Sequence, residues 1–108
     1  MEAIKKGSFT VWTVPKDPIP FVDYSIYIRV SLPTNTTNYS INDLEGYLIG
    51  TDEYEQAFGR GYKPASFETD LDSALVQIRV PGSFNQVRDT IQVKSTLLNE
   101  EQDIEIVF

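Results

Sequence analysis

The chain of 108 residues contains no cysteine and no histidine. The absence of cysteine excludes a disulfide framework, a thiol nucleophile, a thiolate metal site and an iron–sulfur cluster. The absence of histidine excludes a Ser-His-Asp triad, an imidazole base and a histidine-ligated metal. We therefore expect no transition metal and no cofactor, because the side chains that most often hold them are missing.

Positive charge is also scarce in this protein. Nine Lys and Arg residues stand against sixteen Asp and Glu residues, which gives a formal net charge of −7. The basic residues are scattered along the chain, whereas clustered cations that neutralise phosphates supply most of the affinity for nucleic acids. We therefore expect no nucleic-acid partner.

Long apolar runs are absent as well. No stretch approaches the ~20 apolar residues that a membrane-spanning helix needs. Residues 1–7 lack the apolar region of a secretory signal. We expect no membrane partner and a cytoplasmic protein, although an exported domain without its signal peptide would have the same features.

Alternation of apolar and polar residues with a period of two is the main signal that is present. The longest example covers residues 22–32, where Val22, Tyr24 and Ile28 share one face and Tyr27 lies on the other. Such alternation is typical of a half-buried strand. Further strands are expected at residues 9–14, 44–51, 54–58, 66–70, 74–80, 90–94 and 104–108. A polar turn is expected at 97–103, with a single helical turn as the alternative.

Seven or eight strands at spacings of about 8–12 residues predict an all-β protein. We expect a two-sheet β-sandwich with immunoglobulin-like or fibronectin-like topology, and a small open β-barrel is the alternative. Residues 1–108 are expected to form a single domain, with residues 1–7 disordered or loosely attached. The inward positions of the clearest strands predict a core that includes Ile28, Val76, Ile78, Ile91 and Val93.

Acidic residues at alternate positions are the first candidate for chemistry. Glu68, Asp70 and Asp72 follow this spacing, and so do Glu53 and Glu55. On a strand they would share one face at about 7 Å, a spacing that suits Ca²⁺ or a glycosidase carboxyl pair. A solvated strand face has the same pattern, and any chain with sixteen acidic residues contains such pairs. We therefore assign no catalytic, cofactor-binding or metal-binding residue and expect no enzyme.

Aromatic and basic residues at outward positions are the second candidate. Outward tyrosines form contact platforms on sheets, and the loop at residues 59–63 places Arg, Tyr and Lys between glycines, which are residue types of protein interfaces. The alternative is that another element covers the aromatics and that the glycines only shape a turn. The candidate interaction surface consists of Phe21, Tyr27, Tyr47, Arg60, Tyr62 and Lys63.

The last expected strand, residues 104–108, ends on Phe108 and carries only Glu105 as a charge. An edge strand with so little charge invites pairing, so either the strand is central or another copy covers its edge. We therefore expect a homodimer or a larger even-numbered closed assembly, or else another protein as the partner.

These features predict a non-catalytic binding or assembly module that works through protein–protein contacts at a sheet face or edge strand. Accessory proteins of phages and mobile elements fall within this class. The alternative is a small carbohydrate-binding or carboxylate-dependent hydrolytic protein, with Ca²⁺ as its ion. Nothing in the sequence identifies a small-molecule ligand.

Overall fold

The computed structural model describes residues 1–49, 57–59, 63–82 and 88–108. These residues form eight strands and one turn of 3-10 helix, and none of them lies in an α-helix. The described residues therefore contain no helix that is long and apolar enough to cross a membrane. In chain order the elements are β1 (Ile4–Lys6), β2 (Phe9–Val14), β3 (Tyr24–Ser31), η1 (Ile41–Asp43), β4 (Leu44–Ile49), β5 (Ser66–Thr69), β6 (Ser73–Val80), β7 (Arg88–Ser95) and β8 (Glu100–Val107).

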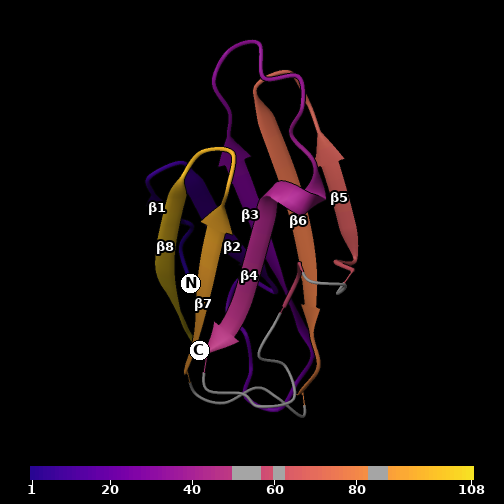
Figure 1. Cartoon of the computed structure of the whole chain (residues 1–108). Helices are drawn as coiled ribbons and strands as arrows, with labels where there is room; N and C mark the ends of the chain where they lie inside the picture. Colours follow the sequence, from indigo (N-terminus) through magenta and orange to yellow (C-terminus); the bar gives the residue numbers. More distant parts are fainter. Residues whose placement is uncertain (50–56, 60–62, 83–87) are drawn as a thin grey trace.

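The strands form two antiparallel sheets that lie in two layers (Figure 1). One sheet has five strands in the order β1-β2-β3-β6-β5, and the other has three in the order β4-β7-β8. The chain changes sheet between β3 and β4, between β4 and β5, and between β6 and β7. The prediction of an all-β protein with two sheets is confirmed.

Alternation along the strands places the core between the two sheets. Ile28 on β3, Val76 and Ile78 on β6, and Ile91 and Val93 on β7 are all fully buried. Each such side chain contributes roughly 1.5–3 kcal/mol through burial. The five core positions predicted from the alternation are therefore confirmed.

The alternation fails at the start of β3, where Val22 was expected to face inward. Val22 is 48% exposed and precedes the strand, which begins at Tyr24. Phe21 has a φ of 65°, and the Val22 amide donates to the Ile19 carbonyl at 3.1 Å, so the chain turns here. Because side-chain parity holds only within continuous extended backbone, the prediction for Val22 was wrong.

Three further elements differ from their expected bounds. β8 begins at Glu100, opposite Ser95, so the turn predicted at 97–103 is shorter than expected. β1 was not predicted as a strand, and it pairs with β2. The strand expected at 54–58 lies mostly outside the described residues, but Phe58 forms an antiparallel bridge with Gly46. A side chain at Gly46 would collide with the Phe58 ring, which explains the glycine within β4.

The N-terminal hairpin lies along the edge of β8 (Figure 1). The Lys6 ammonium donates to the Asp103 carbonyl at 2.8 Å, and the Ser8 amide and hydroxyl donate to the Glu100 carboxylate at 2.7 and 2.8 Å. Sequence reasoning allowed for a central strand or for cover by a second copy. The expectation of a central strand was wrong, because β8 is the edge strand of its sheet. This chain's own first hairpin contacts β8 at Glu100 and Asp103.

Candidate functional site

An aromatic pair lies on the outer surface of the five-stranded sheet. Trp12 on β2 and Tyr27 on β3 are direct cross-strand partners, and each alternates with buried neighbours, so both point away from the core. Their rings stack at a centroid distance of 5.6 Å with an interplanar angle of 6°. Such a pair contributes about 0.5–1.5 kcal/mol beyond the area it buries. Tyr27 is thus half-buried on an outer face, in contact with a partner that the sequence did not identify.

The surroundings of this pair are polar and basic. The Arg29 guanidinium carbon lies 5.8 Å from the centre of the Trp12 ring, within reach of a cation–π contact. On the next strand, the Gln77 amide donates to the Ser25 hydroxyl at 3.2 Å. We call this outer surface the aromatic face and define it by Trp12, Tyr27, Arg29, Leu75, Gln77 and Arg79.

An open hollow of about 440 Å³ lies at one end of the aromatic face. Residues of β2, β3 and β6 line it, among them Ser25, Gln77 and Arg79. Ligand pockets have roughly this volume, but they enclose most of their ligand. This hollow is open to solvent and shares its residues with the aromatic face, so we treat both as one surface.

Behind the hollow, a carboxylate is buried between the sheets. The Tyr24 hydroxyl donates to the Asp89 carboxylate at 2.7 Å, and Asp89 is only 6% exposed. Burial raises the pKa of the Asp89 carboxyl, although the bond from Tyr24 opposes the shift. Burial and the neighbouring Asp89 also raise the pKa of the Tyr24 hydroxyl. The Tyr24 ring meets the Phe108 ring edge-on at 5.2 Å, so the pair is anchored at the C-terminal end of the chain.

Sequence analysis missed Asp89, although a signal for it exists. Asp89 has the same parity as Ile91 and Val93, both of which face the core. The predicted strand began at Thr90, so this parity was not extended back to the acidic residue. A charged residue at an inward position of a strand is rare enough to mark a special site.

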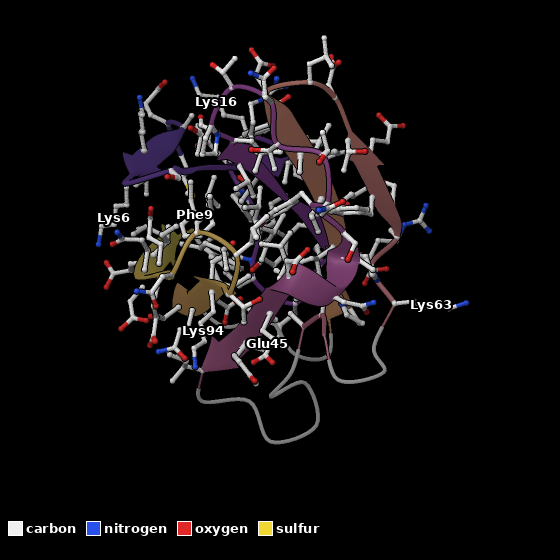
Figure 2. The ribbon with its side chains drawn as sticks, turned by 45° about the horizontal axis from the view of Figure 1, so that its top comes forward. Lys6, Phe9, Lys16, Glu45, Lys63 and Lys94 are labelled. Atoms are coloured by element: carbon white, nitrogen blue, oxygen red, sulfur yellow. The ribbon has the colours of Figure 1, made fainter. Side chains whose placement is uncertain are left out.

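The outer surface of the three-stranded sheet differs from the aromatic face. Among its described side chains, four carboxylates and one ammonium point outward, and we call this surface the acidic face. Glu45 and Lys94 are cross-strand partners on one side of the molecule (Figure 2). Lys94 lies 3.8 Å from the Glu101 carboxylate, and the Tyr47 hydroxyl donates to Glu45 at 2.6 Å. The acidic face is defined by Glu45, Tyr47, Lys94, Glu101, Asp103 and Glu105.

The predicted interaction surface is not one patch among the described residues. Tyr27 and Tyr47 lie on opposite outer faces of the two sheets. Phe21 is 77% exposed in the connection between β2 and β3, and Lys63 extends from the chain beside β5 (Figure 2). Arg60 and Tyr62 lie outside the described residues.

The acidic residues considered for metal binding are placed as follows. Glu68 belongs to β5, and the Asp70 carboxylate accepts a bond from the Leu71 amide at 2.8 Å within the turn after β5. In the described part of the chain, no three His, Cys, Asp or Glu side chains are grouped so as to hold a metal ion. Glu53 and Glu55 lie outside that part.

Comparison of the chain with protein-family models, with curated proteins and with solved structures gives no match. The two outer faces and the buried pair are therefore the features that bear on its function.

Proposed function

We propose that this protein is a non-catalytic binding and assembly module that associates with itself through the aromatic face. The observation that carries the proposal is the contact of Arg29, Trp12 and Tyr27 on the solvent side of a regular sheet. Trp, Tyr and Arg are the residue types most enriched at the energetic centres of protein interfaces. Because the rings already hold one another in place, little side-chain freedom is lost when a partner covers them.

The arrangement of the rings favours a protein partner over a carbohydrate. A sugar stacks on an open aromatic face. Trp12 and Tyr27 each cover one face of the other, and the Arg29 guanidinium lies over Trp12. Both contacts thus reduce the open ring area, mainly on Trp12, and leave an uneven surface of rings and aliphatic chain that suits a protein partner.

The buried pair gives little support to a carboxylate-dependent hydrolase. Glycosidases need two carboxyl groups about 5–9.5 Å apart across a substrate cleft. Asp89 lies between the sheets and accepts the Tyr24 hydroxyl, so its carboxylate is occupied by a structural partner. We therefore interpret this pair as part of the core.

We further infer that the fold is an immunoglobulin-like sandwich. The orders β2-β3-β6-β5 and β4-β7-β8 correspond to the A-B-E-D and C-F-G sheets of a constant-type immunoglobulin domain, with β1 as an added edge strand. The division into two sheets favours this topology over an open barrel. Because such sandwiches carry many unrelated functions, the topology supports the fold assignment and not the binding proposal.

Light scattering over a concentration series from low micromolar to millimolar tests the proposed function. We expect the mean mass of the parent to rise with concentration and that of Trp12→Ala to stay near the monomer value. Leu71→Ala is the matched control, since Leu71 is an exposed apolar residue in the turn between β5 and β6, away from the aromatic face. A parent that stays monomeric throughout would contradict the proposal, and so would equal association of Trp12→Ala and Leu71→Ala.

A further inference from the structure

The two outer faces carry opposite charge, although the protein as a whole is acidic. Outward positions of the five-stranded sheet hold three cationic side chains and one carboxylate, namely Lys5, Arg29, Arg79 and Glu68. Among the side chains that the structure describes, the acidic face holds four carboxylates and one ammonium, from Glu45, Glu101, Asp103, Glu105 and Lys94. In a chain with net charge −7, the aromatic face is therefore a local region of positive charge.

The difference in charge between the two faces determines which surface of a second copy the aromatic face can bind. A symmetric contact of the aromatic face with itself would bring Arg29 and Arg79 of both copies into one interface, four cations in all. Juxtaposed like charges disfavour an interface, whereas opposite charges favour it and fix its register. The acidic face of a second copy offers the complementary charge.

Apolar side chains at matching places support the same pairing. Val14, at the end of β2, is half-exposed beside the aromatic face. On the other sheet, Ile49 and Val107 are similarly exposed at the ends of β4 and β8. Both faces thus combine charge with an apolar part that becomes buried when sheets stack on one another.

We propose that the aromatic face of one copy binds the acidic face of a second copy. This inference rests on the proposed function and names the partner surface. Because the two faces lie on opposite sides of the sandwich, a bound pair still presents one free aromatic face and one free acidic face. The contact is heterologous and leads to an open row of copies, in place of the closed even-numbered assembly expected from the sequence.

The size of the faces sets the strength of the contact. Each face consists of two strands of eight residues and one of six. At about 3.4 Å per residue and about 4.8 Å between strands, it measures at most roughly 27 by 14 Å. Two such faces would bury roughly 750 Å² in total, less than the about 1,200–2,000 Å² of standard interfaces, so the contact is weak. Association is therefore expected at high micromolar concentrations.

A mixing experiment with two charge-reversal variants tests this pairing. Arg29→Glu disables the aromatic face and leaves the acidic face intact. The double variant Glu101→Lys with Glu105→Lys does the reverse. In sedimentation equilibrium, each variant alone is expected to be monomeric at concentrations where the parent associates. Their equimolar mixture is expected to associate, because each variant supplies the intact face that the other lacks.

The controls separate this inference from the proposed function. Asp72→Lys reverses an exposed charge in the turn after β5 and should associate like the parent. If the double variant associates as well as the parent while Trp12→Ala does not, the aromatic face pairs with itself; the head-to-tail pairing is then wrong and the proposed function stands. A monomeric parent overturns both, and a mixture that forms no dimer overturns the pairing. Should Arg29→Glu melt early, Arg29→Gln removes the same charge with less disturbance and is expected to give the same mixture.

Discussion

Two buried tyrosine hydroxyls lie at opposite ends of β7 and are satisfied in different ways. Where β7 begins, Tyr24 donates to the Asp89 carboxylate at 2.7 Å, which ties β3 of one sheet to β7 of the other. Where β7 ends, Tyr39 donates to the Ser95 hydroxyl at 3.1 Å. The two ends of the sandwich are thus closed by the same side chain, with an ionisable acceptor at one end and a neutral acceptor at the other.

The difference predicts that the two bonds respond differently to mutation and to pH. Ser95 also accepts from the Leu98 amide at 3.3 Å, so its hydroxyl keeps a partner without Tyr39. Burial raises the pKa of Tyr39 to about 12, and this end therefore stays neutral over the physiological range. At the other end, burial raises the pKa of Asp89, so the stability supplied there depends on pH.

Substitutions in the apolar middle of the core give the loss of stability with which the two ends are compared. Ile78 on β6 is fully buried between the sheets. Ile78→Ala is expected to lower the free energy of unfolding by about 2–5 kcal/mol, and Ile78→Val by about 0.5–1.5 kcal/mol, through lost burial and the cavity left behind. Urea denaturation measures both. An alanine variant as stable as the parent would show that the ends of the sandwich, and not its middle, hold the sheets together.

Ile78 also shows how much of the fold could be predicted from the sequence. Its inward position follows from a period of two that needs only local sequence. The same reasoning failed at Val22, where a turn at Phe21 interrupts the extended backbone. It missed Asp89 because alternation assigns polar residues to the outside. The alternation of apolar and polar residues therefore predicts the strands and most of the core. It does not predict where a strand ends or that a charged side chain points inward.

The candidate site was less predictable than the core because it depends on strand pairing. Alternation placed Tyr27 outward, but only the register of β2 on β3 brings Trp12 against it. The contact of Lys6 with the Asp103 carbonyl joins residues 97 positions apart, which no local pattern indicates. Pairing of distant strands is decided by the whole sheet arrangement, and single-strand periodicity carries no information about it.

The largest difference between the two ends is expected for Tyr24→Phe. The substitution keeps the ring against Phe108 and removes the hydroxyl that donates to Asp89. Loss of a donor to a buried carboxylate is expected to cost about 1–3 kcal/mol at pH 7. Thermal and urea unfolding measure this value. A variant as stable as the parent would indicate that water replaces the tyrosine hydroxyl.

Tyr39→Phe is the matched substitution at the neutral end and should have a smaller effect. Ser95 retains the Leu98 amide, so only the net value of one neutral hydrogen bond is lost, about 0.5–1.5 kcal/mol. The same unfolding measurements, repeated at pH 5 and pH 8, should give the same loss at both. A loss that equals that of Tyr24→Phe, or that changes with pH, would remove the distinction between the ends.

The smallest effect, and the most specific one, is expected for Asp89→Asn. Asparagine keeps an oxygen that accepts the Tyr24 hydroxyl and removes the charge. A carboxyl whose pKa is raised on folding supplies stability below its unfolded value of about 3.9 and loses it as the pH rises through the folded value. The stability of Asp89→Asn relative to the parent should therefore increase between pH 4 and pH 7, whatever the difference is at pH 4.

Glu100→Gln provides the control of opposite sign for this experiment. Hydrogen bonds from the Ser8 amide and hydroxyl lower the pKa of Glu100, so the stability that this carboxylate supplies is present above its unfolded pKa and is lost as the pH falls. Relative to the parent, Glu100→Gln should therefore be less stable at pH 7 and approach it in acid. Urea titrations at four or five pH values resolve both slopes. Parallel profiles of Asp89→Asn and the parent would mean that burial of Asp89 does not disfavour its charged form, and the two ends of the sandwich would then be equivalent in their response to pH.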